Sequence, residues 1–239
     1  AIAILYMVLI VALIIGFSKL KPLHPIENCQ QVSVTIILPF FNEKANIESC
    51  IRSIFGQQVN RIKWELLAVN DQSTDGSEIL VKNLFAERQN AELLHNPHKG
   101  KKRALLHGIQ CAAGQLIITI DADAYYPPLW LQTMVDSYRQ SNAKLLIGPI
   151  KIGWTNNLFQ QFQQIDFMSL VGSGAGAAGL NRPIMCNGAN LAFEKEAFLQ
   201  LADPYKMEYL SGDDVFLLHA MKKMFPKNIR FIKDVKAIA

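Results

Sequence analysis

Apolar and polar positions alternate in two distinct patterns along most of the chain after residue 31. Short uninterrupted runs of aliphatic and β-branched residues are typical of strands buried on both faces of a sheet. Apolar residues that recur three and four positions apart indicate helices with one buried face. The apolar runs predict strands at residues 32–40, 63–71, 91–96, 115–123 and 143–152. The helical spacing predicts helices at residues 46–58, 73–88, 100–114, 129–140 and 211–223.

This order of segments predicts an α/β fold with a mostly parallel sheet and helices on both of its faces. In such sheets ligands bind at the carboxyl ends of the strands. Three predicted strands end in polar clusters, at residues 39–43, 70–75 and 121–123. The last cluster holds Asp121 and Asp123 directly after a fully apolar run. Buried carboxylates are costly unless they are paired, so the sequence predicts a cation beside them.

The alternation weakens after residue 150. Residues 156–183 combine a Gln-rich segment, in which Phe159, Phe162 and Ile165 are apolar, with the small-residue run GSGAGAAG at 172–179. The favoured interpretation is a helix packed on the sheet, followed by a mobile loop. The alternative is an amphipathic element at a membrane surface. The small-residue run itself is too short to span a bilayer.

The first seventeen residues carry no charge and are followed by Lys19 and Lys21. A membrane-spanning helix needs about 20 apolar residues, whereas a signal peptide places its positive charges before the apolar run. We therefore expect a transmembrane anchor over 1–21, a linker over 22–31 and a catalytic domain over 32–239. The lysines place that domain on the cytoplasmic side. A signal peptide or a buried helix are the alternatives.

Composition excludes some classes of function. The net charge is +4 over 239 residues, and no nucleic-acid-binding module is present, so nucleic acid is not an expected partner. The four cysteines are scattered without a C-x-x-C pair, which disfavours a zinc site or a disulfide framework. Reduced thiols in a cytosolic setting fit this pattern better.

Six segments of the sequence are informative because of their order along the chain. They are LPFFNE (38–43), VNDQSTDGS (69–77), GKKRALLHG (100–108), DADA (121–124), CNGANLAFEKEAF (186–198) and SGDDVFLLHAMKK (211–223). In this order they resemble the motifs of the family 2 glycosyltransferases, which are inverting enzymes of the GT-A fold. Asn70 and Asp213 depart from the family pattern, which has Asp and Glu there. The Q-x-x-R-W segment of processive members is absent, so we expect either an enzyme of another type or a chain that is a fragment. The missing initial Met favours the fragment.

The resemblance implies a role for each matching residue. Asp123, with Asp121, would hold Mg²⁺ or Mn²⁺, because a divalent ion neutralises the departing diphosphate. Asp214 would be the general base for the acceptor, with Asp213 in support. The residues implied in donor binding are Pro39, Asn42, Glu43, Asp71, Lys101 and Asp121.

Structural roles compete with several of these assignments. Glu43 could equally stabilise the first turn of the following helix. Asp213 and Asp214 could cap a helix, and Asp75 is as readily a cap as a ligand contact.

The resemblance implies a membrane-bound glycosyltransferase that is assisted by a divalent metal. It would transfer a sugar with inversion from a nucleotide-sugar donor, with UDP favoured, to a hydroxyl of a lipid-linked or saccharide acceptor. One alternative is a nucleotidyltransferase, but residues 38–46 lack the glycine-rich phosphate loop that such an enzyme needs. Another is a nucleotide-binding membrane protein without catalysis, which Asp121, Asp123 and Asp214 argue against.

Overall fold

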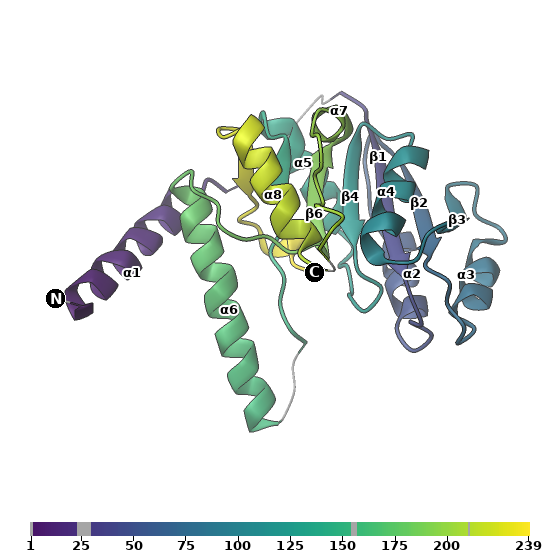
Figure 1. The fold of residues 1–239 in the computed structure, drawn as a ribbon, viewed down its shortest axis with the longest axis horizontal. Helices are drawn as coiled ribbons and strands as arrows, with labels where there is room; N and C mark the ends of the chain where they lie inside the picture. The colour runs from purple at the N-terminus through teal and green to yellow at the C-terminus, as the bar shows by residue number, and fades with distance from the viewer. Residues whose placement is uncertain (1, 23–29, 154–156, 210) are drawn as a thin grey trace.

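The computed structural model describes residues 2–22, 30–153, 157–209 and 211–239. The linker expected over 22–31 lies largely outside these residues. Within them, a seven-stranded sheet has the order β3-β2-β1-β4-β6-β5-β7 (Figure 1). The strands are β1 (Val32–Phe40), β2 (Ile62–Asn70), β3 (Ala91–His95), β4 (Leu116–Ile120), β5 (Leu145–Ile147), β6 (Asn190–Glu194) and β7 (Ile229–Phe231). The helices are α1 (Ile2–Lys19), α2 (Ile47–Phe55), α3 (Ser77–Phe85), α4 (Lys101–Cys111), α5 (Trp130–Gln140), α6 (Leu158–Gly179), α7 (Lys195–Leu199), α8 (Asp213–Met224) and the 3-10 turn η1 (Val235–Ala237).

The predicted mostly parallel sheet is confirmed. β1 pairs in parallel with β2 on one side and with β4 on the other, which makes its carboxyl end a switch point in the strand order. β6 is the exception, because it runs antiparallel to both β4 and β5. Asn190, its first residue, pairs with Ile120, the last residue of β4. The segment before β6 therefore reaches the same edge at which β4 ends.

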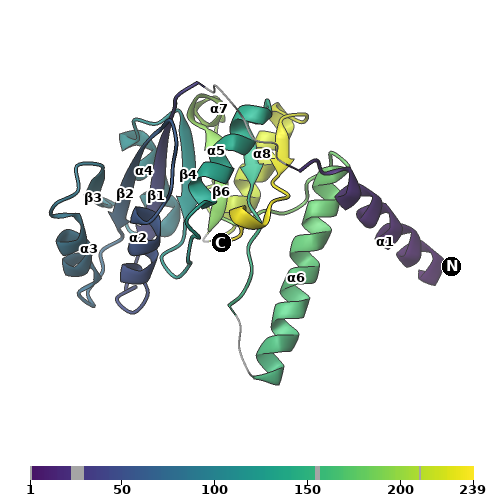
Figure 2. The same cartoon turned by 180° about the vertical axis from the view of Figure 1, so that it is seen from behind.

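Helices cover both faces of the sheet, as predicted (Figures 1 and 2). One core forms where α2, α3 and α5 pack on one face, with Ile51, Val81 and Trp130 among its buried side chains. The other core forms under α4, α7 and α8, with Leu105 and Leu217 among its members. The apolar runs of the strands supply side chains to both cores, which explains why they lack polar alternation.

Several predicted boundaries were too generous. β4 ends at Ile120, so Asp121 and Asp123 lie in a turn, where the amide of Ala124 donates to the carbonyl of Asp121 at 3.3 Å, and not in the strand. β5 is limited to three residues instead of the predicted 143–152. A strand ends where it loses its pairing neighbour, and no periodic pattern in the sequence reports that loss.

For residues 156–183 the predicted helix in the Gln-rich segment is confirmed, whereas the predicted loop over the small-residue run is wrong. The Gln-rich segment and the small-residue run form one continuous helix, α6, of 22 residues, and the run is not a loop. α6 extends away from the sheet, and both cartoon views show it meeting α1 near the C-terminal ends of the two helices (Figures 1 and 2). The small residues are explained by this crossing. A Cβ on Gly176 would lie 2.4 Å from the carbonyl oxygen of Leu13, and one on Gly16 would lie 2.0 Å from that of Gly176.

α1 is, among the described residues, the one helix long and apolar enough to cross a membrane by length and composition. A signal sequence meets the same criterion. A buried core helix does not describe α1, because Gly16 is its single buried residue.

Candidate active site

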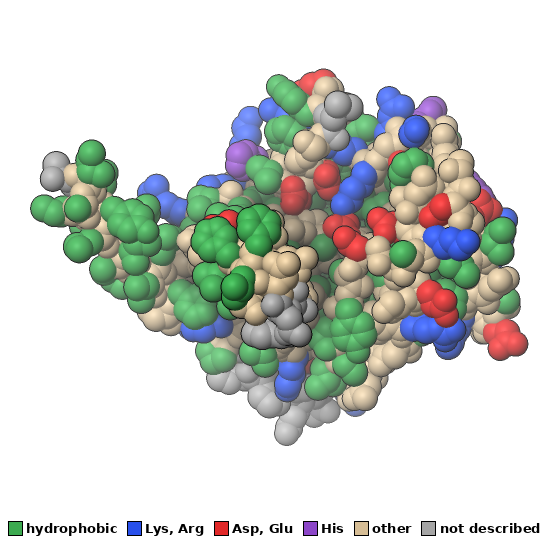
Figure 3. Space-filling model, turned by 90° about the horizontal axis from the view of Figure 1, so that it is seen from below, with side chains coloured by type: hydrophobic (Ala, Val, Ile, Leu, Met, Phe, Trp, Pro, Cys, Tyr) green, Lys and Arg blue, Asp and Glu red, His purple; other side chains and the backbone are tan. Residues whose placement is uncertain are grey.

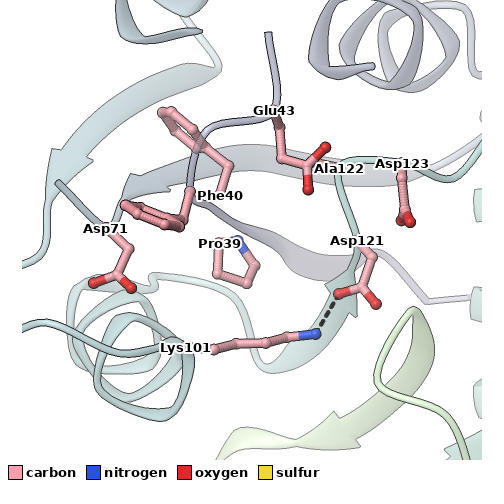
Figure 4. A pocket seen from close by; sticks show the side chains of 9 residues that line it. Pro39, Phe40, Glu43, Asp71, Lys101, Asp121, Ala122 and Asp123 are labelled. Carbon is pink, nitrogen blue, oxygen red and sulfur yellow. Dashed lines mark hydrogen bonds and ion pairs between the residues drawn. The ribbon is translucent and has the colours of Figure 1, made fainter. Parts of the chain in front are cut away.

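A cavity of about 290 Å³ lies at the carboxyl edge of β1, β2 and β4 (Figure 4). Its described lining comprises Pro39, Phe40, Phe41, Glu43, Asp71, Lys101, Asp121, Ala122 and Asp123. These residues come from three strand ends and the start of α4, so the fold joins segments that are far apart in the sequence. All the residues predicted for donor or metal binding, with the exception of Asn42, are in this lining.

Asp121 and Lys101 form the central charged pair of the cavity. The Nζ atom of Lys101 lies 2.6 Å from Oδ1 of Asp121, and the two side chains are 47% and 28% exposed. Burial alone would lower the pKa of Lys101, but the charge of Asp121, followed by the charges of Asp213 and Asp214, raises it overall. Lys101 therefore carries a positive charge that acts on Asp121 directly and on Asp213 and Asp214 through the electrostatic field. Figure 4 shows Asp123 beyond Asp121, on the side away from Lys101.

Asp71 is held rigidly at the end of β2. Its carboxylate accepts the backbone N–H of Gly100 at 2.8 and 2.9 Å and the side-chain amide of Asn96 at 2.6 Å. The φ angle of Gly100 is +120°, a conformation that other residues rarely adopt. Asp71 thus fixes the start of α4, and with it the position of Lys101, while it still lines the cavity.

Three polar residues near the cavity have structural partners. Asn42 accepts the backbone N–H of Thr74 at 2.8 Å through its side chain, which joins the loops after β1 and β2. Asn70 accepts the N–H of Ser73 at 2.9 Å, as a turn-forming residue does. Asp75 accepts the N–H of Ser77 at 2.9 Å and that of Lys44 at 2.9 Å, just before the N-cap residue Gly76 of α3. Asn70 and Asp75 therefore have structural roles in the turns that they form. Asn42 connects two loops and is not among the described residues that line the cavity.

Asp213 and Asp214 occupy the first turn of α8, and Gly212, with φ of 82°, takes the N-cap position. Neither aspartate is the N-cap residue. The carboxylate of Asp214 accepts the N–H of Val215 at 2.7 Å and that of Gly188 at 3.3 Å. Burial raises the pKa of Asp214, and the neighbouring charge of Asp213 adds to the increase. Asp214 is therefore a stronger base than an exposed aspartate, and it is still fixed in direction by two backbone donors.

A buried hydrogen-bond network connects the two carboxylate clusters. The hydroxyl of Tyr126 donates to the carbonyl of Ala189 at 2.7 Å and accepts the N–H of Asp121 at 3.2 Å. The indole of Trp130 donates to the side chain of Asn190 at 3.0 Å. The turn that carries Asp121 is thereby joined to the segment that contacts Asp214. Nothing in the sequence indicates Tyr126, because an isolated polar residue gives no signal until its partner is known, whereas Asn190 stands in the segment 186–198 without an assigned role.

The pKa values of the two described thiols near the site are raised. Burial is the main cause that raises the pKa of both Cys50 and Cys186, and the nearby aspartates raise it further. Both thiols are therefore protonated at neutral pH. Covalent catalysis by cysteine does not fit this arrangement.

The fold and the acidic cavity define a domain of the GT-A class. A family model for glycosyl transferase family 2 matches residues 35–198. This match covers more than half of the chain, and the chain therefore belongs to that family. The resemblance proposed from the six sequence segments is confirmed.

Curated relatives agree with this assignment. Glycosyltransferase AglE of Haloferax volcanii is 23% identical over 185 residues, which cover 76% of this chain and 59% of AglE. The undecaprenyl-phosphate 4-deoxy-4-formamido-L-arabinose transferase of Salmonella paratyphi A is 34% identical over 131 residues, covering 54% of this chain and 39% of the relative. The chain thus spans about half of the length of these relatives.

Solved structures agree on the fold. The mannosyltransferase PcManGT of Pyrobaculum calidifontis, in complex with GDP-Man and Mn²⁺, gives a TM-score of 0.68 at 18% identity and covers 99% of this chain and 66% of that one. The glucosyl-3-phosphoglycerate synthase of Mycobacterium tuberculosis, in complex with Mn²⁺ and UDP-glucose, gives a TM-score of 0.59 at 18% identity, with 84% and 68% covered. At this identity the likeness shows the GT-A fold alone.

Proposed function

We propose that this protein transfers a sugar from a nucleotide-sugar donor, a UDP-sugar by preference, to a hydroxyl group of an acceptor, with inversion. The carrying observation is the single cavity that unites Asp71, Lys101, Asp121 and Asp123. A diphosphate needs cationic partners, whereas the nucleoside needs hydrogen-bonding groups on a rigid frame. Lys101 supplies a charge, and Asp71 is a rigid acceptor at the end of the drawn site opposite Asp123 (Figure 4).

The acidic residues fit Mg²⁺ or Mn²⁺. Among the described residues no cluster of three or more His, Cys, Asp or Glu side chains could hold a metal ion by itself. Mg²⁺ is commonly bound by one or two carboxylates together with substrate phosphates and water, and Asp121 and Asp123 offer this number. When bound, the ion would neutralise charge on the leaving diphosphate. The Mn²⁺ complexes of PcManGT and the mycobacterial synthase support this choice.

Asp214 is the proposed general base. It would accept the proton of the acceptor hydroxyl as that oxygen attacks the anomeric carbon, and its raised pKa suits this role. Asp213 lies beside it and increases its basicity through like charge. Inversion by a single displacement requires no enzyme nucleophile, which agrees with the inert thiols of Cys50 and Cys186.

The proposed location is the membrane, with the catalytic domain on the cytoplasmic side. α1 has the required length and composition, and its last residue, Lys19, and Lys21 beyond it lie on the side of the domain. The Nζ atom of Lys233 donates to the carbonyl of Phe17 at 3.1 Å, which adds a third cation at the end of α1. Fractionation of the full chain tests this proposal, and recovery in the soluble fraction without detergent would contradict it.

A screen of nucleotide sugars tests the activity. The full chain would be incubated with UDP- and GDP-sugars, with Mn²⁺, Mg²⁺ or a chelator, and thermal stabilisation and donor hydrolysis would be measured. We expect stabilisation by UDP-sugars that depends on the metal, together with slow release of UDP. Release of pyrophosphate from a nucleoside triphosphate and a sugar phosphate would instead indicate a nucleotidyltransferase. Binding without turnover in the presence of acceptors would indicate an inactive scaffold.

A further inference from the structure

Lys102, the second residue of α4, is a buried lysine. Lysine side chains normally lie at the surface of a protein, and Figure 3 shows several Lys and Arg side chains at the surface of one face. Lys102 is 5% exposed, and among the described residues it is the one buried lysine. None of the ion pairs within that part of the chain includes it. A buried ammonium group without a carboxylate partner is costly, so its other contacts have to compensate.

The ammonium group of Lys102 holds the segment that leads into α8. Its Nζ atom donates to the carbonyl of Lys206 at 3.2 Å and to the carbonyl of Tyr209 at 2.8 Å. The same atom lies 4.9 Å from the centroid of the Phe216 ring, which belongs to α8. Lys102 therefore joins the first turn of α4 both to residues 206–209 and to α8 itself.

Residues 206–209 form a turn that packs on α8. The N–H of Tyr209 donates to the carbonyl of Lys206 at 3.1 Å, and Lys206 has a φ angle of 46°, in the left-handed region. The rings of Tyr209 and Phe216 lie 5.2 Å apart. Lys102 thus binds a folded turn, and a displacement of this turn would move the start of α8 with it.

The first turn of α8 depends on such external contacts. Its N-cap residue is Gly212, and no side chain accepts a hydrogen bond at the cap. Asp214, the proposed base, lies in this turn. The contact of its carboxylate with the N–H of Gly188 is long, at 3.3 Å. The direction of Asp214 therefore depends on what holds the 206–209 turn and Phe216.

The start of α4 serves the donor cavity at the same time. The carboxylate of Asp71 accepts the N–H of Gly100, and Nζ of the next residue, Lys101, lies 2.6 Å from Asp121. Lys101 and Lys102 are neighbours in one helical turn. The first acts on the donor cavity and the second on the segment before Asp214, so α4 sets the distance between the two parts of the site.

We propose that Lys102 is a positioning residue, which fixes the 206–209 turn on α4 and thereby the direction of Asp214 relative to the donor cavity. This inference rests on the proposed glycosyltransferase function. Lys102 does not line the described donor cavity, so we expect it to affect kcat and not donor binding. A misplacement of about 1 Å can cost about 10²-fold in rate. Lys102→Met keeps the apolar stem and removes the donors, and it should lower kcat at least tenfold.

Lys195→Met is the matched control. The Nζ atom of Lys195 donates to the carbonyl of Ala112 at 2.6 Å, so the same substitution removes a lysine-to-carbonyl bond at the other end of α4. Lys195 lies at the start of β4, where its N–H donates to the carbonyl of Gln115, whereas Asp121 follows the far end of that strand. We expect Lys195→Met to retain the kcat of the wild type.

Kinetics and calorimetry on the full chain in detergent make the comparison. Release of UDP from the UDP-sugar that the screen selects gives kcat and KM, and titration with UDP and Mn²⁺ gives the affinity for the nucleotide. For Lys102→Met we expect a lower kcat, an unchanged KM and unchanged UDP affinity. A purely structural role would reduce the active fraction and the UDP binding stoichiometry together.

Two thiols report on the position of α8 independently of activity. Sγ of Cys186 donates to the carbonyl of Asp214 at 3.2 Å, and Sγ of Cys50 donates to the carbonyl of Asp121 at 3.4 Å. Labelling with N-ethylmaleimide, followed by mass spectrometry, gives a rate for each thiol. Loosening of α8 exposes Cys186 alone, whereas global unfolding exposes both. Lys102→Met should raise the ratio of the Cys186 rate to the Cys50 rate about tenfold or more, as expected for a lost hydrogen bond from a charged donor.

The outcomes separate this proposal from the proposed function. A normal kcat or an unchanged ratio of thiol rates in Lys102→Met overturns the positioning role and leaves the transferase in place. An equal loss of kcat in Lys195→Met overturns it as well. Lys102→Gln, whose amide is one atom shorter, replaces Lys102→Met under the same criteria if the methionine variant no longer binds UDP. A wild type without UDP release and without metal-dependent UDP binding overturns the proposed function, and the role of Lys102 with it.

Discussion

Replacing Asp214 with asparagine separates the proposed chemistry from donor binding. The change keeps the shape of the side chain but removes a carboxylate that is partly buried at the start of α8. General-base assistance is worth about 10²- to 10⁴-fold, which is about 3 to 5 kcal/mol of barrier. We expect kcat to fall by about this factor. UDP binding should be nearly unchanged, because Asp214 is not among the residues that line the donor cavity.

The structure predicts a smaller effect on folding. Asp214 accepts N–H groups from Val215 and Gly188, at 2.7 and 3.3 Å, and an asparagine oxygen can keep one of these bonds. One lost hydrogen bond costs about 0.5 to 1.5 kcal/mol. This is well below the expected loss in the catalytic barrier, so the two effects can be told apart by kinetics and chemical denaturation on the same variant.

The pH dependence of folding stability provides an independent test of the raised pKa of Asp214. Burial raises the pKa of Asp214 above 3.8, so the folded protein binds this proton more tightly than the unfolded chain. The Asp214 contribution to stability is therefore most favourable below the ordinary pKa, and it declines as pH rises through the folded-state pKa. Asp214→Asn lacks this decline. The stability difference between wild type and variant should shift in favour of the variant as pH rises.

The same raised pKa should appear in kinetics. The apparent pKa of the acidic limb of the kcat/KM profile should be higher than that of an ordinary aspartate, since Asp214 must be ionised to accept a proton. Asp213→Asn is the matched control, and we expect it to reduce transfer less. Normal transfer by Asp214→Asn together with crippled transfer by Asp213→Asn would mean that the two roles are reversed. Normal transfer by both variants would refute a base in this segment.

Three further changes test other parts of the molecule. Asp123→Ala, or chelation of the wild type, should abolish most UDP binding in calorimetry, and equal affinity with and without Mn²⁺ would contradict the metal assignment. Lys102→Met should lower the free energy of unfolding by about 1 to 3 kcal/mol, because the buried amine donates to carbonyls of the 206–209 segment at 3.2 and 2.8 Å. Gly176→Leu should lower the melting temperature in detergent by separating α6 from α1, whereas Gly172→Leu, with open space around its Cβ, should retain or slightly raise it. Equal melting temperatures for these two glycine variants would contradict the close crossing.

The location of the site was predictable because parallel α/β sheets gather the carboxyl ends of their strands at one edge. The sequence showed that three apolar runs end in polar clusters, and the structure brings Asp71, Asp121 and Glu43 from those clusters into one cavity. The motif order also indicated the family, since several segments in a fixed order are far more specific than any one of them.

Other features depended on partners that are remote along the chain. The hydrogen bond from Tyr126 to Ala189 joins residues 63 positions apart, and the bond from Gly188 to Asp214 joins residues 26 positions apart. The direction of β6 follows from its antiparallel pairing with β4. Local periodicity carries no information about such pairings.

By itself, the sequence determined the alternation of strands and helices, the apolar helix at the N-terminus and the acidic residues of the site, because these follow from local periodicity and residue chemistry. Only the tertiary structure decided the state of residues 172–179. The glycines of this run predict a loop locally, since glycine disfavours a helix by about 1 kcal/mol relative to alanine. The crossing with α1 reverses this preference, because only glycine at positions 16 and 176 lets the two backbones approach so closely. The helix that results places Phe167 in the lining of a cavity that Asp121 and Asp123 also line, at a position that no local pattern could reveal.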